Sequence, residues 1–285
     1  MVLQTLTSEC RNAFAAINPE NDQLVSLCVS GREIMHGGGK PKDMQTPEDG
    51  RDWNNSELIA FPVYGPTRGG ILYADGEEYG RFSGNHGIMR LLKPTFVRKT
   101  GGVSYETWYS YEARAEGPDS LDAEFSLEKT ITVVENGLDA KFRVNNHDKR
   151  PRRHQFAWHP VFKTGDINAH IVVPDSNQDY LLQEIQDSPG AVVKIEGAHS
   201  VRLELLNGDV TVSSADLPDF VLWSKPEERD EAGNIKKMAF KSVAIEPVYS
   251  LKGIKHSPRN LDHTNSVLLE PGQSKEYLVT IRVDQ

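Results

Sequence analysis

Apolar and polar residues alternate along much of this chain, which is the pattern of β-strands that bury one face and expose the other. Residues 201–205 read Val-Arg-Leu-Glu-Leu, and residues 209–213 read Asp-Val-Thr-Val-Ser. Asn207 and Gly208 lie between these two runs. Asn-Gly between alternating runs predicts a hairpin with a type I′ turn, in which both central residues have positive φ.

A second pair, Asn136 and Gly137, lies between runs at 129–134 and 138–144 and predicts another hairpin. Further runs with strand character occur at 24–29, 102–111, 171–173, 191–195, 220–223, 242–245 and 277–283. Glycine and proline separate most of these runs, and we find no amphipathic helix longer than about two turns. Short strands in this arrangement predict an all-β sandwich or barrel.

Nothing in the sequence divides the chain, so we expect one domain over residues 1–285. No repeat of fixed period occurs, and no stretch is rich enough in proline, glycine or serine to be a linker. The charged stretch at 225–237 is predicted to be a solvated, helix-like or loop-like excursion between two strands. Its alternative role is to bind a partner.

The chain is acidic, with 32 Lys and Arg residues against 41 Asp and Glu residues and a formal net charge of −9. An acidic chain repels phosphate backbones, which argues against nucleic-acid binding. The first 30 residues lack a basic segment followed by an apolar core, so we expect no secretory leader. No run of about 18 apolar residues occurs, so we expect no membrane span and a cytoplasmic location. Cys10 and Cys28 are expected to be free thiols, with a disulfide between them as the alternative.

The common catalytic and metal-binding motifs are missing. Nine histidines occur, but none has the spacing of a zinc finger or a zincin, so we expect no metal. The chain also lacks a Gly-x-Gly-x-x-Gly fingerprint after a strand, a P-loop and a Gly-x-Ser-x-Gly motif. The candidate chemistry must therefore come from less familiar combinations of residues.

Three ionisable residues lie next to glycine or proline, which constrains the backbone at each. His86 precedes a glycine, where the chain can turn sharply. His159 ends an apolar strand-like run and precedes a proline, which holds it at a strand end. Glu246 follows the buried run at 242–245, ends that strand and also precedes a proline. A carboxylate after a core strand is costly to bury unless it is paired, so Glu246 is either hydrogen-bonded structurally or tuned for proton transfer.

Five short motifs follow one another along the chain. They are Phe-Pro-Val-Tyr-Gly-Pro-Thr-Arg-Gly-Gly at 61–70, His-Gly-x-x-Arg at 86–90, Trp-His-Pro-x-Phe at 158–162, Ile-Glu-Pro at 245–247 and Leu-Leu-Glu-Pro-Gly-Gln at 268–273. This series resembles the aldose 1-epimerase (galactose mutarotase-like) family from about residue 20 to the end of the chain. The resemblance implies one large antiparallel β-supersandwich, an all-β fold with few short helices, and no metal or organic cofactor.

The resemblance also implies an isomerase activity, the interconversion of the α and β anomers of a free aldose such as glucose or galactose. One group removes the proton of the C1 hydroxyl and another protonates the ring oxygen, so that the ring opens and then closes on its other face. Matched residue by residue, the family's catalytic base corresponds to Glu246, its general acid to His159 and its second histidine to His86. The expected partner is a small-molecule sugar, and the expected assembly is a monomer or a homodimer.

Four residues are expected to bind the sugar: Arg68, Asn85, Asp219 and Trp158. Arg68 corresponds to the family's substrate-binding arginine, and Asn85 would orient sugar hydroxyls beside it. Asp219 is the candidate for an acidic ligand that some members have. A tryptophan, either Trp158 or Trp223, would pack against the apolar face of the sugar.

This sequence departs from the family pattern at two places, Ile-Met at 88–89 and Val161. Both departures change the expected pocket, so the resemblance does not fix which sugar is bound. The first alternative is a hexose-6-phosphate 1-epimerase, for which Arg68, Arg90 and the basic stretch at 149–153 would supply a phosphate site. The second is a carbohydrate-binding protein that has lost catalysis. A third, a glycoside hydrolase or lyase on a similar sandwich, needs a second carboxylate opposite the first.

Overall fold

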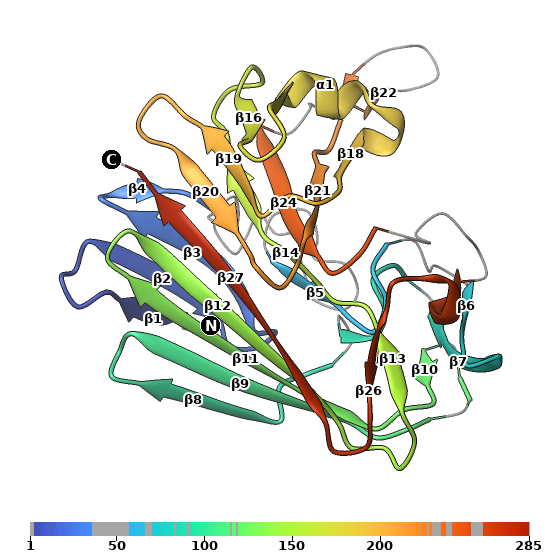
Figure 1. The fold of residues 1–285 in the computed structure, drawn as a ribbon. Helices are drawn as coiled ribbons and strands as arrows, with labels where there is room; N and C mark the ends of the chain where they lie inside the picture. Colours follow the sequence, from blue (N-terminus) through green and yellow to red (C-terminus); the bar gives the residue numbers. More distant parts are fainter. Residues whose placement is uncertain are drawn as a thin grey trace.

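Antiparallel β-sheet makes up nearly all the regular structure in a computed structural model of the chain (Figure 1). The structure describes residues 3–35, 57–65, 70–82, 84–89, 92–114, 116–117, 119–226, 228–229, 235–237, 241–251 and 259–284. Within them, helical structure is limited to α1 (Leu182–Asp187) and two 3-10 turns, η2 (Pro189–Ala191) and η3 (Leu261–His263). The prediction of an all-β fold with few short helices is confirmed.

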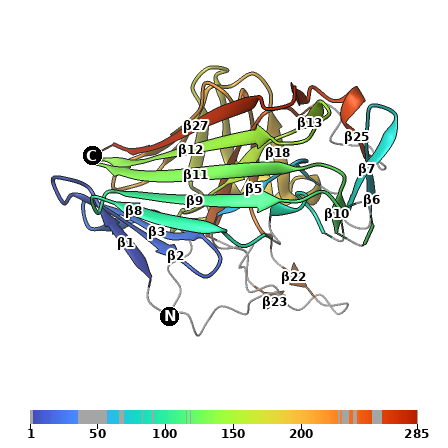
Figure 2. The same cartoon turned by 90° about the horizontal axis from the view of Figure 1, so that it is seen from below.

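The largest sheet has nine strands, and its long strands lie side by side in both views (Figure 1 and Figure 2). Across the sheet they are β17 (Gln178–Leu181), β16 (His170–Val173), β19 (Ser200–Glu204), β20 (Val210–Ser213), β27 (Ser274–Val283), β12 (Gly137–Asn146), β11 (Phe125–Val134), β9 (Ser104–Tyr111) and β8 (Phe96–Thr100). Burial alternates residue by residue along β11 and β27, as the sequence predicts.

Both predicted hairpins form, β11 with β12 and β19 with β20, but the predicted type I′ turns are wrong. Neither Asn136 nor Asn207 has positive φ. The glycine in the first pair has a different purpose, because a Cβ on Gly137 would lie 1.9 Å from the carbonyl oxygen of Ile281. Gly137 therefore lets β12 approach β27 closely, whereas Asn136 keeps a negative φ.

A second sheet has six strands, in the order β18 (Val192–Ile195), β21 (Asp219–Trp223), β24 (Ser242–Val248), β14 (Ala157–His159) and β5 (Leu58–Ala60), with β15 (Val161–Lys163) also paired to β24. These strands come from distant parts of the sequence. The predicted runs at 220–223 and 242–245 belong to its central strands β21 and β24, and β14 and β5 join them from earlier parts of the chain. Neighbouring strands of this sheet pair antiparallel.

Smaller sheets complete the described part of the chain. One contains β1 (Gln4–Thr7), β2 (Ala13–Asn18), β3 (Gln23–Val29) and β4 (Arg32–Glu33), and another contains β10 (Ser120–Leu121), β7 (Glu77–Phe82), β6 (Gly70–Ala74) and β25 (Arg259–Asn260). Two pairs remain, β13 (Arg152–His154) with β26 (Val267–Leu269), and β22 (Glu228–Arg229) with β23 (Ile235–Lys237). The β22–β23 pair corrects the helix-like or loop-like expectation for 225–237, because the described residues there form a short antiparallel ribbon.

Inward-facing side chains of the nine-stranded, six-stranded and β1–β4 sheets form one main core. Leu127, Phe142 and Trp158 are fully buried members of it from different strands. A separate small cluster consists of Ala60, Tyr64, Ala157, Val221, Val248 and Leu251. The six-stranded sheet is therefore packed on both faces, by the main core on one and by this small cluster on the other.

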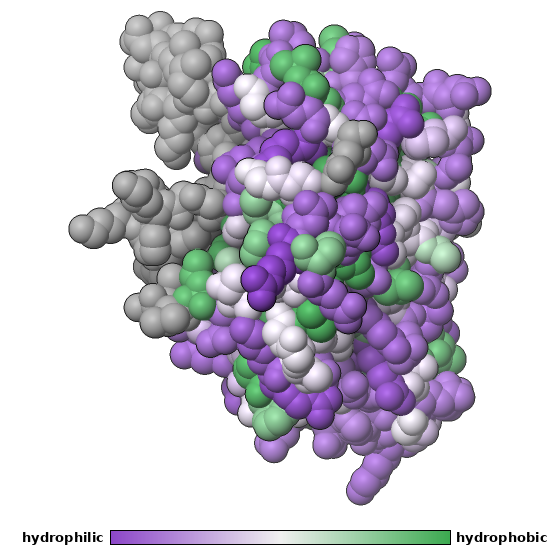
Figure 3. All heavy atoms as spheres, turned by 90° about the vertical axis from the view of Figure 1, so that its left-hand side faces the viewer, coloured by the Kyte–Doolittle hydropathy of each residue, from purple (hydrophilic) through white to green (hydrophobic). Residues whose placement is uncertain are grey.

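Polar residues predominate on the face shown in Figure 3, with hydrophobic residues scattered among them. In the described part of the chain, the large apolar side chains at the surface are spread over several elements, with Phe96 and Val97 adjacent on β8: Leu3, Phe14, Phe96, Val97, Leu206, Leu268 and Leu278. Scattered apolar side chains of this kind are normal on globular proteins. None of the helices in the described ranges is long and apolar enough to span a membrane.

Candidate active site

One face of the six-stranded sheet carries ionisable side chains, whereas the other face belongs to the main core. Side chains alternate along β14 and β24, so His159 and Glu246 point away from that core while Trp158 and Ile245 point into it. The same alternation along β21 puts Trp223 on the His159 face. The sheet itself thus brings side chains together from three strands.

Glu246 does not end its strand as the sequence predicts, because β24 continues to Val248. On one side β24 pairs with β21 along this whole stretch. On the other side its registered pairs with β15 stop at Ala244, and its pair with β14 is at Val248. Pro247, which has no N–H to donate to a ladder, lies in this interval. The strand therefore passes through the proline, and Glu246 lies inside the sheet beside the end of β14.

Two groups hold the Glu246 carboxylate. Its Oε1 lies 3.3 Å from Nε2 of His159, and its Oε2 accepts a 2.7 Å hydrogen bond from the Tyr64 hydroxyl. Burial raises the pKa of Glu246, whereas the charge of His159 and the hydrogen bond from Tyr64 lower it, and burial prevails. Glu246 therefore binds a proton more readily than an exposed glutamate, which suits a group that takes a proton and returns it.

His159 is the last residue of β14, and Pro160 ends the strand as the sequence predicts. Its register partner on β5 is Leu58. The ring centroid of His159 lies 5.9 Å from that of Trp223 and 6.2 Å from that of His86. Its Nδ1 is buried and has no hydrogen-bond partner among the described residues. One ring nitrogen thus faces Glu246 while the other is unsatisfied.

His86 reaches the same place from a loop. His86 and Gly87 both have positive φ, 67° and 75°, in agreement with the predicted sharp turn. The carbonyl of His86 accepts a 3.2 Å hydrogen bond from the Phe61 N–H, and the N–H of Ile88 donates to the Phe61 carbonyl at 2.9 Å. A Cβ on Gly87 would lie 2.2 Å from that carbonyl oxygen, so only glycine fits. The loop is therefore attached to the end of β5, and its shape directs the His86 ring.

We call Tyr64, His86, His159, Trp223 and Glu246 together the Glu246 cluster. Exposure increases outward from the carboxylate: Glu246 is 2% exposed and His159 6%, whereas His86 and Trp223 are half-buried. The cluster thus connects a buried carboxylate with the protein surface.

Metal ligation has no support in the described residues. Within those ranges, no three or more His, Cys, Asp or Glu side chains are grouped so that they could hold a metal ion. Cys10 and Cys28 are free thiols, as the sequence predicts.

Solved structures resemble this chain over its whole length, although no family model and no curated protein matches its sequence. A galactose mutarotase-like protein from Lactobacillus casei ATCC 334 has a TM-score of 0.73 and 17% identity, with 99% of this chain and 100% of that chain covered. This chain has the galactose mutarotase-like fold. The supersandwich that the sequence motifs imply is therefore confirmed.

Two further structures share the galactose mutarotase-like fold with this chain. A protein from Escherichia coli K12, provisionally assigned as an aldose 1-epimerase, has a TM-score of 0.73 and 15% identity, with 99% of each chain covered. A galactose mutarotase related enzyme from Lactobacillus acidophilus has a TM-score of 0.71 and 16% identity, with 100% of this chain and 98% of that chain covered. At these identities the likeness establishes the fold, and the chemistry has to come from the side chains.

Of the two tryptophans proposed to pack against a sugar, the galactose mutarotase-like fold brings only Trp223 to the Glu246 cluster. Trp158 is fully buried in the main core, with its ring centroid 5.7 Å from that of Phe142. Because Trp158 and His159 are consecutive on a strand, they point to opposite faces of the sheet. The expectation that Trp158 binds the sugar is therefore corrected, because Trp158 faces the core. Trp223 is the tryptophan that lies beside His159.

The remaining predicted sugar-binding residues differ in where they lie. Asn85 is exposed and precedes His86 on the loop. Asp219 shares the sheet face of Glu246, but its Oδ1 accepts from the Gly197 N–H at 3.0 Å and its Oδ2 from the Leu251 N–H at 2.7 Å. These two bonds give Asp219 a structural use as the anchor of two loops. Arg68 lies outside the described residues, and so does Arg90.

Tyr64 is a member of the Glu246 cluster that the sequence reasoning missed. It lies within the motif at 61–70, in which the family resemblance assigns a role to Arg68 alone. A signal was present, because Tyr64 precedes a glycine and follows Phe-Pro-Val, and the same kind of constrained backbone singled out His86, His159 and Glu246. What the sequence does not show is that its hydroxyl meets a residue 182 positions away.

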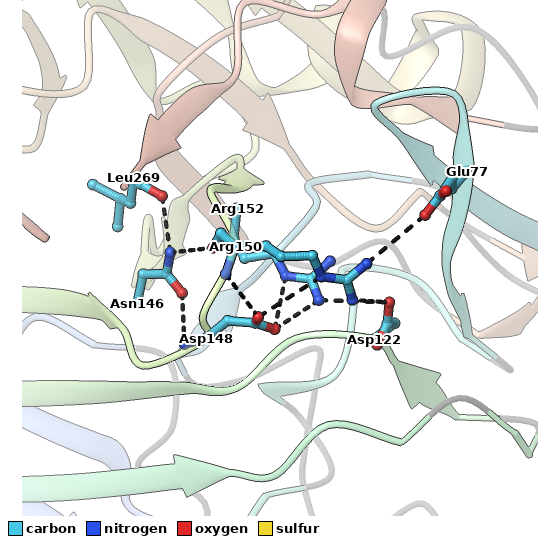
Figure 4. A network of polar contacts seen from close by, with 7 residues as sticks. All are labelled: Glu77, Asp122, Asn146, Asp148, Arg150, Arg152 and Leu269. Atoms are coloured by element: carbon cyan, nitrogen blue, oxygen red, sulfur yellow. Dashed lines mark hydrogen bonds and ion pairs between the residues drawn. The ribbon is translucent and has the colours of Figure 1, made fainter. Parts of the chain in front are cut away.

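The basic stretch at 149–153 is already matched by carboxylates (Figure 4). Asp148 pairs with Arg152 at 2.6 Å, and Asp122 pairs with Arg150 at 2.7 Å. Arg153 lies within 3.3 Å of Asp262 and 3.2 Å of Asp75. A phosphate at this stretch would have to compete with these acidic partners. The network instead links the end of β12 to the β6–β7 sheet.

Proposed function

We propose that this protein is an aldose 1-epimerase that interconverts the α and β anomers of a free hexose such as glucose or galactose. Glu246 removes the proton from the C1 hydroxyl while His159 gives a proton to the ring oxygen, so that the C1–ring oxygen bond breaks and C1 becomes an aldehyde. Rotation about the C1–C2 bond presents the other face of the aldehyde. The ring oxygen then returns its proton to His159, the new C1 hydroxyl takes the proton from Glu246, and neither group is consumed.

His86, Asn85 and Trp223 have supporting roles in this proposal. His86 donates a hydrogen bond to the ring oxygen, on which negative charge develops. Asn85 orients sugar hydroxyls, together with Arg68. Trp223 packs against the apolar C–H face of the sugar, beside His159.

The observation that carries the proposal is the contact between Glu246 and His159 on the sheet face away from the main core, with the His86 ring next to that of His159. A proton-transfer reaction needs an acid and a base at the same reacting centre, and these residues supply them 3.3 Å apart. A protein that only binds sugar has no need for a buried carboxylate whose pKa is raised. The paired state of the 149–153 stretch favours a free sugar over a hexose 6-phosphate.

The test is polarimetry on freshly dissolved α-D-glucose and α-D-galactose. We expect the wild-type protein to accelerate mutarotation above the spontaneous rate, and Glu246→Gln to lower kcat/KM by about 100-fold to 10,000-fold, the usual contribution of a general base. Glu270→Gln is the matched control, because Glu270 is exposed in the turn after β26. It should retain wild-type kinetics.

Other outcomes point to the alternatives. Acceleration with glucose 6-phosphate but with neither free sugar would show that the phosphorylated hexose is the substrate. Saturable sugar binding, by calorimetry, without any mutarotation would show a carbohydrate-binding protein. If Glu246→Gln were as active as wild type, Glu246 would not be the base of the reaction.

A further inference from the structure

Tyr64 is buried next to the proposed base and is not part of the acid–base assignment above. Its hydroxyl donates to Oε2 of Glu246 at 2.7 Å, while Oε1 of the same carboxylate faces His159. The two oxygens of Glu246 are thus in different surroundings. A carboxylate held at both oxygens has less freedom to rotate than one held at a single oxygen.

The Tyr64 ring is fixed independently of this hydrogen bond. Tyr64 is 5% exposed and belongs to the small cluster that also contains Ala60, Ala157 and Val248, one residue from each of three neighbouring strands. The ring therefore lies over the sheet face that carries Glu246. Because packing holds the ring in place, removal of the hydroxyl alone leaves the rest of the contact intact.

The segment that carries Tyr64 also orients the second histidine. The N–H of Gly65 donates to Nδ1 of His86 at 3.2 Å, and the Gly65 carbonyl accepts from the N–H of His86 at 3.0 Å. Because Nδ1 accepts a hydrogen bond, the neutral ring of His86 carries its proton on Nε2. His86 is thereby set as a hydrogen-bond donor. The Tyr64 and His86 ring centroids are 5.2 Å apart. The contact that orients Glu246 and the contact that orients His86 thus come from two consecutive residues, Tyr64 and Gly65.

We propose that Tyr64 is a positioning residue of this site, whose hydroxyl orients the Glu246 carboxylate and favours its ionised form before each proton transfer. The inference rests on the proposed function, because it assigns Tyr64 a part in the same reaction. Tyr64 acts through Glu246 and does not itself exchange protons with the sugar.

Few charged or titratable groups compete with Tyr64 for Glu246. In the part of the chain that the structure describes, His159 on β14 and Tyr64 face the carboxylate, and His86 lies next to both. On the β21 side, the register partner of Glu246 is Val221. A hydrogen bond to the ionised form lowers a carboxyl pKa, so loss of the Tyr64 hydroxyl should raise that of Glu246.

The experiment compares wild type with Tyr64→Phe in two measurements. The first is kcat/KM for mutarotation between pH 4.5 and pH 8. The active form of Glu246 is ionised and is lost as the pH falls through its pKa, so the acid limb of the profile should move to higher pH in the variant. A hydrogen bond to a charged group predicts a shift of about one pH unit. At pH 8 the variant should lose roughly tenfold in kcat with little change in KM.

The second measurement does not depend on activity. Carbon-13 NMR of the glutamate side-chain carboxyls, with Glu246 assigned by comparison with Glu246→Gln, gives the Glu246 titration directly. We expect its midpoint to rise by about one pH unit in Tyr64→Phe. Replacement of Tyr64 by 3-fluorotyrosine, which keeps the hydroxyl and makes it a stronger donor, should move the midpoint the other way. The fluorinated protein also serves if Tyr64→Phe does not fold.

Tyr105→Phe is the matched control, because Tyr105 is a buried tyrosine whose hydroxyl has no partner among the described residues. It should leave both measurements unchanged. An unaltered Glu246 titration in Tyr64→Phe would overturn the inference. If Tyr64→Phe also lost as much activity as Glu246→Gln while the Glu246 titration stayed unaltered, Tyr64 would have to transfer a proton itself. If wild type shows no mutarotation, the proposed function fails, while the NMR titration still decides whether Tyr64 controls Glu246.

Discussion

Glu246 and His154 are both buried and ionisable, and their surroundings give them opposite properties. Glu246 faces a histidine and a tyrosine, and burial raises its pKa above that of an exposed glutamate. His154 lies in the core, where its Nε2 is 2.8 Å from the Tyr277 hydroxyl. Burial, with a smaller contribution from Lys275, lowers the pKa of His154 to about 3. Burial of an ionisable residue therefore does not mark a functional site by itself, and what distinguishes Glu246 is the pair of a carboxylate and a histidine in contact.

The low pKa of His154 predicts a loss of stability in acid. Between pH 7 and pH 5 the unfolded chain protonates this histidine, with an ordinary pKa of 6.5, while the folded protein does not. The free energy of unfolding should therefore fall by about 2 kcal/mol from this residue alone. Urea unfolding at the two pH values checks this. His154→Leu should be less stable than wild type at pH 7 but lack this part of the decline.

His170→Gln, which replaces an exposed histidine at the start of β16, is the control and should keep the wild-type decline. An equal decline in His154→Leu and wild type would contradict the assignment.

At the scale of single elements, the site depends on two irregular features. The interval in the pairing of β24 accommodates Pro247 and leaves Glu246 beside the end of β14. The His86–Gly87 turn joins a loop to the end of β5 by backbone hydrogen bonds. Regular strands supply the frame, and each irregular feature positions one ionisable side chain of the Glu246 cluster.

Gly87→Ala tests the importance of that turn. The added methyl would meet the Phe61 carbonyl and would also occupy a left-handed backbone, so the loop has to move. A displacement of about 1 Å at His86 predicts a loss of about 100-fold in kcat/KM, measured by polarimetry. We also expect a loss of stability of more than about 2 kcal/mol in urea.

Gly76→Ala is a closely matched control. Gly76 has φ of 77°, almost that of Gly87, but a Cβ there would meet nothing within 4 Å. It should cost about 1–2 kcal/mol from the backbone alone and leave kcat/KM unchanged. Equal effects of the two substitutions on activity would mean that the close approach to Phe61 does not matter.

At the scale of the whole molecule, a buried lysine joins three sheets behind the site. Lys129 on β11 contacts Glu57, which precedes β5, and lies 3.2 Å from Oδ2 of Asp22, in the turn between β2 and β3. The two carboxylate residues that pair with Lys129, Asp22 and Glu57, line a cavity of about 20 Å³ together with Leu58 and Met89. Leu58 is the register partner of His159, and Met89 follows the His86 loop. The network therefore supports the site from the core side of the sheet.

Lys129→Met should lower the free energy of unfolding by about 3–5 kcal/mol, because it leaves Asp22 and Glu57 buried without their cation. Urea unfolding measures the loss. The triple variant Asp22→Asn, Glu57→Gln, Lys129→Met should recover most of it, since the buried charges disappear together. Lys141→Met is the control.

Lys141 on the adjacent strand β12 forms a 2.8 Å ion pair with Glu276, and both side chains are half exposed. Its substitution should cost at most about 1 kcal/mol. A cost for Lys129→Met no larger than that would show that the buried network does not hold the sheets together.

The sequence by itself determined the all-β class, many of the strands and the residue types that the candidate site can contain. The two-residue period marks the strands, because alternate side chains of a strand must face a core and the solvent. The prolines after His159 and Glu246 and the glycine after His86 mark positions of constrained backbone, and the order of five motifs implied the fold. These are local properties, carried by residues within a few positions of one another.

The tertiary structure decided which side chains meet. Nothing local shows that the Tyr64 hydroxyl reaches Glu246, that Trp223 rather than Trp158 lies beside His159, or that two backbone N–H groups occupy Asp219. The extension of β24 past Pro247 also depends on where β14 and β15 pair with it. Each of these outcomes is set by the register between strands that are distant in sequence, and a shift of one residue would turn every side chain to the other face.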